Sequence, residues 1–414
     1  MSSLQPVRGT HDILPDDSRR YRHVVETARR VSELYGFGEI TTPIFEFTEV
    51  FSRTLGETSD IVTKEMYTFQ DRGGDEITLR PEGTAGIARA FISGGLAQEL
   101  PLKLFYTGPM FRYERPQKGR LRQFHQFGVE LLGIATPRAD IEVIALAAQT
   151  LESLGALAKT KLEINTLGDR ESRESYRKVL VEFLSQHEAN LSEDSRTRLK
   201  KNPLRVLDSK DQGDIAILRQ APLFPDYLTD DARAFFATVC EGLKNLGVDF
   251  AVNPRLVRGL DYYCHTAFEF TTEHLGAQGT VLAGGRYDGL IAAMGGRDTP
   301  GVGWAAGIER LSMLLDAVPE SRRPIAIIPA EDGQDSAALR LAGDLRRAGF
   351  AVELGFSGNM SKRMKRANKA RARAAVILGP DEWSRQAVML RDLDSGEQSE
   401  VPLAALNDRL AAYR

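Results

Sequence analysis

The segment from Thr107 to Gly133 constrains the fold more than any other part of this sequence, because its two ends alternate with a period of two. Alternation of this kind predicts a pair of β-strands joined as a hairpin. In the second arm, one face takes Phe127, Val129 and Leu131. The other face of the second arm takes Gln126, Gly128 and Glu130. In the first arm, one face takes Met110, Arg112 and Glu114. We therefore expect one face to pack on a core and the other to border a site.

The loop between these arms, from Glu114 to Leu121, is rich in hydrogen-bond donors. They are Arg115, Gln117, Lys118 and Arg120. Such a density of cationic and amide groups suits a polyanion. A solvated hairpin with a charged tip is the alternative, since Pro116 and Gly119 form a good turn in any protein.

Composition narrows the class of protein. The chain has 414 residues, which is more than one core usually fills, so two or three domains are expected. Its formal net charge is −3, so any binding of nucleic acid has to be local. Cys240 and Cys264 match no metal-binding spacing and the histidines show no HxxxH pairing, which disfavours structural zinc and a disulfide framework. The first residues show no signal core or presequence, and no apolar run approaches the roughly 18 residues of a membrane span, so we expect a cytoplasmic protein.

Two segments before the hairpin have clear patterns. Apolar residues at helical intervals from Tyr21 to Tyr35 predict a helix that stops at Gly36. The sequence GEITTPIFEF that follows is strand-like and contains Pro43. Because proline cannot donate to a β-ladder, this strand is expected at a sheet edge or a subunit contact.

A short strand ends at Pro81, within the sequence RPEGT. Glu82 and Thr84 lie two residues apart in the turn that follows, and together they can accept hydrogen bonds from an ammonium group. Alternatively, Thr84 is the N-cap of the helix that runs through Phe91. The sequence leaves both interpretations open.

Two helical regions follow the hairpin. Residues 139–154 predict an amphipathic helix, and residues from about 170 to 230 predict a charged helical insertion with a thin apolar stripe. The charges of the insertion are expected to form a solvated face. A nucleic-acid contact is the alternative, through Arg196, Arg198, Lys200 and Lys201.

The sequence RGLDYY is a second dense site. Arg258, Asp261 and Tyr263 would be costly to bury in a plain core, so they indicate a ligand or a satisfied polar network. Further on, glycines at 301, 303 and 307 precede a helix that carries Arg310, and they are expected to let the backbone approach a flat ligand. Their spacing, GxGxxxG, is not the dinucleotide fingerprint, and the sequence contains no Walker A motif.

A domain boundary is expected between Val318 and Arg323, where VPESRR precedes a new strand. Strands and helices then alternate and end in a hairpin across Gly396, which predicts a small α/β domain with a mixed sheet. One of its helices, SKRMKRANKARAR, holds seven basic residues within thirteen. Those predicted to lie largely along one side are Lys362, Lys365, Arg366, Lys369 and Arg373. Positive charge without an acid favours RNA or DNA phosphates over a solvated surface.

These motifs together resemble the class II aminoacyl-tRNA synthetases, and within them the histidyl-tRNA synthetase family, over essentially the whole chain. GFGEITTPIFEF is similar to the first, dimer-forming motif of the class, GPMFRYERPQKGRLRQFHQFG to the second and GVGWAAGIERL to the third. RGLDYY is similar to a signature of the histidine-specific members. The fold class implied is α+β. It comprises an antiparallel-sheet catalytic domain with a helical insertion over residues 1–323, and a mixed-sheet α/β anticodon-binding domain over residues 324–414.

The resemblance also implies roles for individual residues. The ammonium group of L-histidine is held by Glu82, Thr84 and Gln126, and its imidazole by Glu130 and Tyr263. The ATP-binding residues expected are Arg112, Glu114, Arg120, Arg258 and Arg310. Of these, Arg112 and Arg258 are expected to act on the reacting α-phosphate and carboxylate. Contacts to tRNA(His) are expected from Arg115, Gln117, Lys362, Lys365 and Lys369.

The expected reaction is the ligation of L-histidine to tRNA(His). The histidine carboxylate attacks the α-phosphate of ATP, pyrophosphate leaves with Mg²⁺, and the histidyl-adenylate passes its amino acid to the tRNA. No protein side chain is assigned to the metal, and the enzyme is expected to be a cytoplasmic homodimer without a membrane contact.

An alternative is the regulatory paralogue of this family that partners ATP phosphoribosyltransferase in histidine biosynthesis without charging tRNA. Such proteins typically lack the C-terminal domain and the arginine of RGLDYY, whereas this sequence has both.

Overall fold

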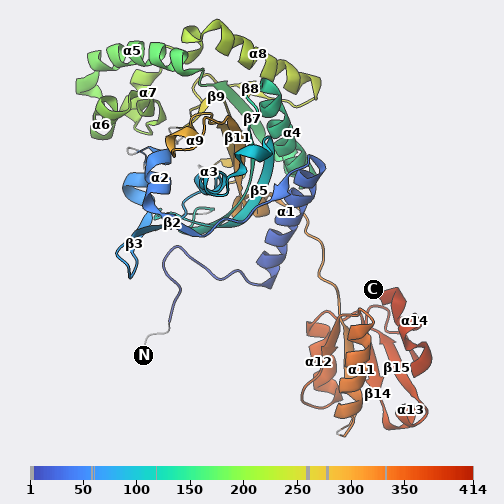
Figure 1. Ribbon diagram of the computed structural model, residues 1–414. Coiled ribbons are helices and arrows are strands. Elements are labelled where there is room, and N and C mark those ends of the chain that lie inside the picture. The colour runs from blue at the N-terminus through green and yellow to red at the C-terminus, as the bar shows by residue number, and fades with distance from the viewer. Residues whose placement is uncertain are drawn as a thin grey trace. The chain divides into compact units, whose positions relative to one another are not determined.

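The computed structural model describes residues 4–56, 59, 61–117, 119–257, 262–276, 279–331 and 333–413. The chain divides into two compact units, Met1–Val318 and Pro319–Arg414, which are described separately (Figure 1).

A largely antiparallel sheet is the framework of the first unit. Within the described residues its eight strands follow the order β1 (Gly38–Glu39), β5 (Leu102–Phe111), β6 (Gln123–Leu132), β11 (Gly301–Gly307), β10 (Thr280–Arg286), β9 (Cys264–Thr271), β7 (Lys161–Thr166) and β8 (Ala251–Val252). The strands from β5 to β7 pair antiparallel, whereas β1 and β8 pair in parallel at the two edges. The predicted hairpin forms β5 and β6, and β11 lies on the other side of β6. The antiparallel fold class expected from the sequence is confirmed.

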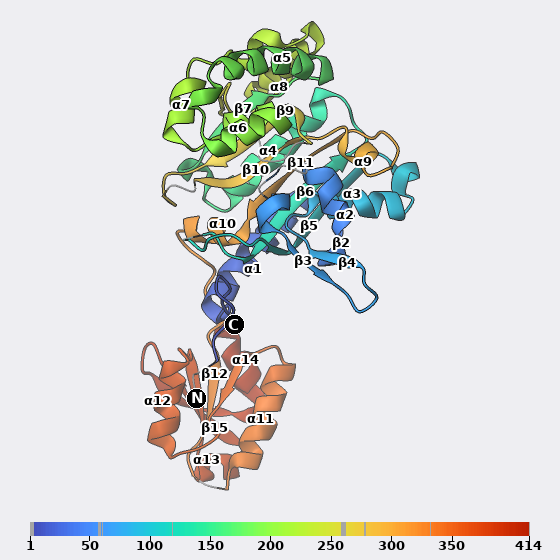
Figure 2. The same cartoon turned by 90° about the vertical axis from the view of Figure 1, so that its left-hand side faces the viewer.

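One face of this sheet packs on the main core. Phe127, Val129 and Leu131 are buried there, as the alternation in the hairpin predicts. The helices that complete this core are α1 (Pro15–Leu34), α4 (Pro137–Ser153), α8 (Asp230–Asn245) and α10 (Ile308–Leu314). Both views place α4 and α8 side by side next to β7 and β9 (Figure 1, Figure 2). The amphipathic helices from both ends of this unit, α1 and α10, therefore pack on the same core.

The opposite face of the sheet is covered as well. Helices α3 (Thr84–Ser93) and α9 (Leu290–Ala293) pack there against Tyr106, Met110 and Leu132 of the hairpin. The face that the sequence assigns to a site is therefore partly core, and only the end of the hairpin near its loop is left for a ligand.

A smaller antiparallel sheet has the strand order β2 (Phe45–Phe47), β4 (Glu76–Leu79) and β3 (Tyr67–Gln70). The prediction of one strand across GEITTPIFEF is therefore wrong, because β1 belongs to the large sheet and β2 to the small one. Pro43 lies between them. Both pieces are edge strands, and the proline, which has no N–H, donates to neither ladder.

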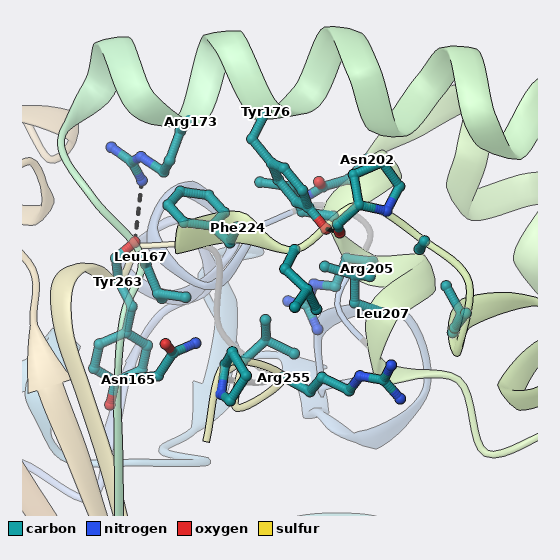
Figure 3. Close-up of a pocket in the computed structure, with 17 residues that line it drawn as sticks. Asn165, Leu167, Arg173, Tyr176, Asn202, Arg205, Leu207, Phe224, Arg255 and Tyr263 are labelled. Carbon is teal, nitrogen blue, oxygen red and sulfur yellow. Dashed lines mark hydrogen bonds between the residues drawn. The ribbon is translucent and has the colours of Figure 1, made fainter. Parts of the chain in front are cut away.

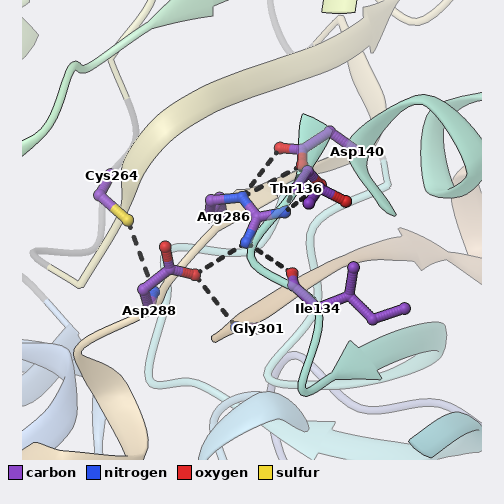
Figure 4. A network of polar contacts seen from close by, with 7 residues as sticks. All are labelled: Ile134, Thr136, Asp140, Cys264, Arg286, Asp288 and Gly301. Atoms are coloured by element: carbon purple, nitrogen blue, oxygen red, sulfur yellow. Dashed lines mark hydrogen bonds and ion pairs between the residues drawn. The ribbon is translucent and has the colours of Figure 1, made fainter. Parts of the chain in front are cut away.

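A buried ion network joins β10 to α4 (Figure 4). The guanidinium of Arg286 and the carboxylate of Asp140 are fully buried and bonded to each other through two nitrogens of the arginine. Arg286 Nη1 also donates to Asp288 Oδ1 and to the Ile134 carbonyl, both at 3.0 Å, and Nη2 donates to the Thr136 carbonyl at 3.3 Å. These bonds fix the end of the strand that leads directly into Tyr287.

The predicted insertion is helical and has its own small core. Its helices are α5 (Arg170–Gln186), α6 (Glu193–Lys201) and α7 (Gln212–Leu218). The buried residues they share with the turns between them are Tyr176, Leu180, Leu184, Leu191, Leu199, Val206, Ala221 and Phe224. The thin apolar stripe is sufficient because it faces inward on all three helices.

The second unit is a five-stranded mixed sheet in the part of the chain that is described. Its strand order is β13 (Val352–Leu354), β12 (Ile325–Pro329), β14 (Ala374–Leu378), β15 (Ala387–Asp392) and β16 (Gln398–Pro402). The first three strands pair in parallel and the last two pairings are antiparallel. Helices α11 (Asp335–Arg347) and α12 (Met360–Lys369) pack against it. Two short helices, α13 (Pro380–Ser384) and α14 (Leu406–Leu410), were not anticipated from the sequence.

Two negative findings hold for the described residues. No helix among them is both long enough and apolar enough to cross a bilayer. No three of their His, Cys, Asp or Glu side chains gather in a way that could hold a metal ion.

Candidate active site

A cavity of about 480 Å³ opens beside the hairpin loop, a volume in the usual range for small-molecule sites. The predicted residues that line it are Glu82, Thr84, Arg112, Glu114, Arg120, Gln126, Tyr263 and Arg310. Arg115 and Gln117 are exposed on the loop and do not line it. Arg258, Asp261 and Lys118 lie outside the described residues. The fold thus brings together side chains from segments that are far apart in the sequence.

The carboxylate of Glu82, and not the side chain of Thr84, caps the helix that follows. The Glu82 carboxylate accepts hydrogen bonds from the backbone N–H groups of Thr84 at 2.7 Å and Ala85 at 2.8 Å, so Glu82 satisfies the start of α3. The Thr84 hydroxyl instead donates to Glu130 Oε1 at 2.7 Å. Burial raises the pKa of Glu82, and these hydrogen bonds oppose the rise. Thr84 therefore lines the cavity without capping the helix, which is capped by the neighbouring carboxylate of Glu82.

Glu130 is the buried centre of this network. It is 1% exposed, it accepts from Thr84 through one oxygen, and it accepts from the Tyr287 hydroxyl through the other. Burial raises its pKa to about 8, although the hydrogen bonds from Tyr287 and Thr84 lower it. Glu130 does not itself line the cavity, but the two residues bonded to it, Thr84 and Tyr287, do.

Sequence reasoning missed Tyr287. It follows the strand-like residues up to Arg286, but nothing local connects it with Glu130, which is on a strand that does not neighbour β10. Its ring lies 5.8 Å from that of Tyr262, which in turn lies 4.6 Å from Tyr263. Three tyrosines therefore form one side of the cavity, where the sequence indicated only Tyr263.

The glycines of the third motif have a packing role that the sequence did not predict. A Cβ on Gly303 would overlap the Glu130 carboxylate, and one on Gly301 would overlap the ring of Tyr287. The missing side chains thus make room for the residues of the network, and Gly303 and Gly307 also line the cavity. Gly307 meets only the flexible side chain of Arg310.

Two guanidinium groups line the cavity next to the loop. Arg112 Nε donates to the Pro81 carbonyl at 2.8 Å, and its guanidinium carbon lies 5.3 Å from the centre of the Phe124 ring. Glu114 is ion-paired with Arg120 at 2.5 Å, whereas Arg112 Nη1 lies 3.9 Å from the Glu114 carboxylate. The close partner of Glu114 in this cavity is therefore Arg120, not Arg112.

Arg310 connects the loop to the sheet. Its Nε donates to the Gly119 carbonyl at 3.0 Å and its Nη1 to the Thr280 carbonyl at 2.5 Å. The preceding residue, Glu309, accepts from the His125 backbone N–H at 2.9 Å and contacts the His125 ring at the same distance. Sequence reasoning missed this second pair, and it holds the start of β6 against α10.

Gln126 offers an acceptor to a ligand. Its side chain lines the cavity, and its buried Oε1 has no hydrogen-bond partner among the described residues. An unpaired buried carbonyl oxygen is costly unless a ligand or water donates to it. A group that carries several N–H donors, such as an ammonium, meets this requirement.

Fewer basic side chains are exposed on helix α12 of the second unit than the sequence predicts. Arg363 is buried and donates to the Pro329 carbonyl at 2.7 Å, and Arg366 pairs with Glu353 at 2.7 Å. Helix α12 ends at Lys369, so Arg373 lies beyond it and is not part of its face. The exposed lysines that remain are Lys362, Lys365 and Lys369, spaced three and four residues apart and hence on one side of the helix.

Comparisons with known proteins agree over the whole chain. Residues 9–311 match the family model described as histidyl-tRNA synthetase, and residues 324–413 match the model described as an anticodon binding domain. The histidine-tRNA ligase of Rhodospirillum rubrum is 64% identical over 414 residues, and that of Gluconobacter oxydans is 58% identical, with 100% of each chain covered in both cases.

Solved structures give the same picture. Apo histidyl-tRNA synthetase of S. aureus has a TM-score of 0.84 and 34% identity, with 98% of this chain and 99% of that chain covered. A Bacillus halodurans structure described as an ATP phosphoribosyltransferase regulatory subunit/histidyl-tRNA synthetase has a TM-score of 0.66 over 88% of this chain and 97% of that one. At 24% identity, this second likeness speaks for the fold alone.

Proposed function

Because this chain belongs to the histidyl-tRNA synthetase family, we propose that it ligates L-histidine to tRNA(His) through a histidyl-adenylate made from ATP. The observation that carries this proposal is one cavity whose lining includes Arg112 and Arg310 together with Glu82 and Thr84, and Thr84 hydrogen-bonds to the buried Glu130. Such a cavity has acceptors for an amino acid and cations for a nucleotide. The regulatory paralogue is not favoured, since residues 324–413 match an anticodon-binding model.

The amino acid is proposed to bind in the part of the cavity nearest α3. Glu82, Thr84 and Gln126 receive its ammonium group, and the unpaired Oε1 of Gln126 supports this assignment. Glu130 and Tyr263 are proposed to bind the imidazole, which when neutral has one donor and one acceptor nitrogen. An analogue without these nitrogens leaves buried polar groups unpaired, and sites of this kind reject such analogues by roughly 10⁴-fold or more.

Activation of the amino acid is proposed to depend on arginines. Arg112 and Arg258 hold the α-phosphate and the carboxylate that attacks it, because a planar guanidinium can bind two anionic oxygens at once. Arg310, Arg120 and Glu114 are proposed to contact the rest of the nucleotide. Mg²⁺ is assigned to the phosphate oxygens, as is usual for this ion, and to no protein side chain.

Two surfaces are proposed to contact the tRNA. Arg115 and Gln117 are exposed on the hairpin loop beside the cavity, which suits the acceptor end. Lys362, Lys365 and Lys369 form the exposed face of α12 and suit backbone phosphates. We propose that charging takes place in the cytoplasm, and the two free thiols of Cys240 and Cys264 agree with a reducing compartment.

A homodimer is proposed from the apolar surface near the small sheet. Ile44, Phe45, Phe47 and Phe69 are 43%, 53%, 59% and 48% exposed. A cluster of exposed large apolar side chains marks an interaction surface. We expect Phe47→Asp to shift the protein from dimer to monomer in light scattering after gel filtration. Leu34→Asp, at another exposed apolar position on α1, is the control and should leave the mass unchanged.

The test of the activity is amino-acid-dependent exchange of pyrophosphate into ATP by the purified chain. Exchange is expected with L-histidine and with no other standard amino acid. A protein that exchanges with a different amino acid contradicts the pocket assignment. One that exchanges with none contradicts the proposed function as a whole.

A further inference from the structure

The two ends of the insertion are fastened together at the sheet. Asp169 precedes α5, and its carboxylate accepts from the Ser172 N–H at 2.7 Å and from the Thr229 hydroxyl at 2.5 Å. Thr229 precedes α8, and its own N–H donates to the Ser172 hydroxyl at 3.0 Å. Each of these two capping residues thus binds the other as well as its own helix. The first turn of α5 is therefore held in a fixed place relative to the start of α8.

The next residue on that turn contacts the candidate active site. Arg173 Nη1 donates to the backbone carbonyl of Tyr263 at 3.0 Å (Figure 3). The chain just after Tyr263 is held by backbone bonds as well, since Leu167 N–H donates to the His265 carbonyl at 2.5 Å and His265 N–H donates to the Gly168 carbonyl at 2.8 Å. The segment that carries Tyr263 is thus bonded to the segment that leads into the insertion.

A second cavity, of about 120 Å³, lies beside Tyr263 on the side of the insertion. Figure 3 shows it between Tyr176 and Phe224 of the insertion and Asn165 and Tyr263 of the sheet side, with Arg173 at its margin. Side chains do not fill this space, so close packing on this side contributes less to holding Tyr263 than it would in a filled core. A charge-assisted hydrogen bond to the Tyr263 carbonyl then has a larger share in fixing the residue.

We propose that Arg173 is a positioning residue for the amino-acid pocket, which it serves by holding the Tyr263 backbone in register with the cavity. The side chain of Tyr263 lines the catalytic cavity, so a shift of its carbonyl moves the phenol away from the imidazole. Through this bond the insertion becomes part of histidine selection. The inference rests on the proposed function, because it takes Tyr263 to be a histidine contact.

The test uses Arg173→Met, which keeps the aliphatic stem and removes every donor, and Arg173→Lys, which keeps one cationic donor. The control is Arg170→Ala on the same helix, because Arg170 is 89% exposed and pairs only with Glu174 among the described residues. The KM values for histidine and ATP, kcat and the melting temperature are measured in pyrophosphate exchange and thermal unfolding.

Arg173→Met is expected to raise the KM for histidine roughly tenfold, the usual effect of losing a hydrogen bond to a charged group. We expect the KM for ATP and kcat to change by less than about threefold, since the lost interaction concerns substrate binding. Arg173→Lys should restore most of the affinity, and Arg170→Ala should resemble the unsubstituted protein. A lower melting temperature or lower kcat with an unchanged KM for histidine would show a purely structural contact and overturn the proposal.

A double-variant comparison tests whether Arg173 acts through Tyr263. In a Tyr263→Phe background, Arg173→Met is expected to add less than about threefold to the KM for histidine, because coupled residues are not additive. A full tenfold increase there overturns the proposal. The unsubstituted protein separates the two claims. If it shows no histidine-dependent exchange, both the proposed function and this inference are wrong. If it exchanges normally and Arg173→Met has the same KM for histidine, only this inference is wrong.

Discussion

At the scale of single residues, the proposed contact between Glu130 and the imidazole of histidine depends on whether Glu130 is protonated. Burial raises the pKa of Glu130 to about 8, and the hydroxyls of Tyr287 and Thr84 oppose that rise by donating to its carboxylate. Between about pH 6.5 and 8, free imidazole is neutral and Glu130 holds one proton. The complex needs one titratable proton shared by the imidazole and the Glu130 carboxyl group. In this pH range that proton is already present on Glu130, so binding neither takes up nor releases a proton.

The affinity for histidine is therefore expected to be constant over this window and to fall on both sides of it. Below about pH 6.5 the imidazolium has to lose a proton before it binds, and above about pH 8 Glu130 has to regain one. Calorimetric titration of histidine across this range measures both limbs. We expect Glu130→Gln to bind histidine more weakly at every pH. Because glutamine does not titrate, the fall in affinity above pH 8 that we assign to Glu130 should be absent in this variant.

The difference between the two profiles separates Glu130 from titration of the ligand itself. Tyr287→Phe provides a second check, because it removes a donor to the carboxylate and should move the upper limb to higher pH. An upper limb that is identical in the unsubstituted protein and in Glu130→Gln would contradict the assignment.

At the scale of elements, the central position of β11 matters more than its sequence motif. This strand lies between β6 and β10, so it passes between Glu130 and the segment that leads to Tyr287. Its glycines leave the space in which both side chains meet. A strand with side chains at Gly301 and Gly303 could not accommodate this network.

Gly303→Ala is expected to abolish measurable histidine binding and to lower the stability by about 1–3 kcal/mol, because the added methyl overlaps the Glu130 carboxylate and the Val129 backbone. Gly289→Ala is the matched control, since a Cβ there meets nothing within 4 Å. Histidine titration and urea unfolding measure the two effects. Normal affinity in Gly303→Ala would show that the network tolerates displacement.

The buried ion pair between Arg286 of β10 and Asp140 of α4 leads to a separate prediction about stability. Arg286→Met leaves the buried carboxyl group of Asp140 without its partner, so we expect a loss of about 3–5 kcal/mol in urea unfolding. Arg347→Ala removes an exposed arginine whose partner is Asp344 and should cost at most about 1 kcal/mol. Comparable losses in the two variants would mean that the buried network is not a structural requirement.

At the scale of the whole molecule, the proposed chemistry lies in the first unit, and one of the two surfaces proposed to contact tRNA lies in the second. The cavity belongs entirely to the first unit, and the lysine face of α12 belongs to the second. The net charge of −3 gives no sign of that face, because acidic residues elsewhere balance it. Variants on α12 should therefore affect tRNA binding alone.

Lys365→Ala combined with Lys369→Ala is expected to weaken tRNA binding and to reduce the slope of log affinity against log salt by about one for each lysine. Pyrophosphate exchange should be unchanged. The control removes the same charge from another exposed helix end of this unit, with Arg346→Ala and Arg347→Ala. Filter binding at several salt concentrations measures both, and equal effects of the two pairs would rule out a specific face.

The sequence alone determined those features that depend on neighbours along the chain. The hairpin, the helix that became α1 and the order of elements in the second unit all follow from periodicity and turn residues, which act over a few residues. The family motifs are equally local, and the comparisons confirm the family they indicate.

The tertiary structure decided what depends on which strands lie side by side. No local pattern connects Tyr287 or Gly303 with Glu130, and only the strand order places them together. Whether Thr84 caps the helix was decided in the same way, because Glu82 accepts from the first backbone N–H groups of α3 and the Thr84 hydroxyl donates to Glu130. Buried polar groups have to find partners wherever the fold puts them, so their bonds follow from the packing of the whole unit rather than from the order of the residues.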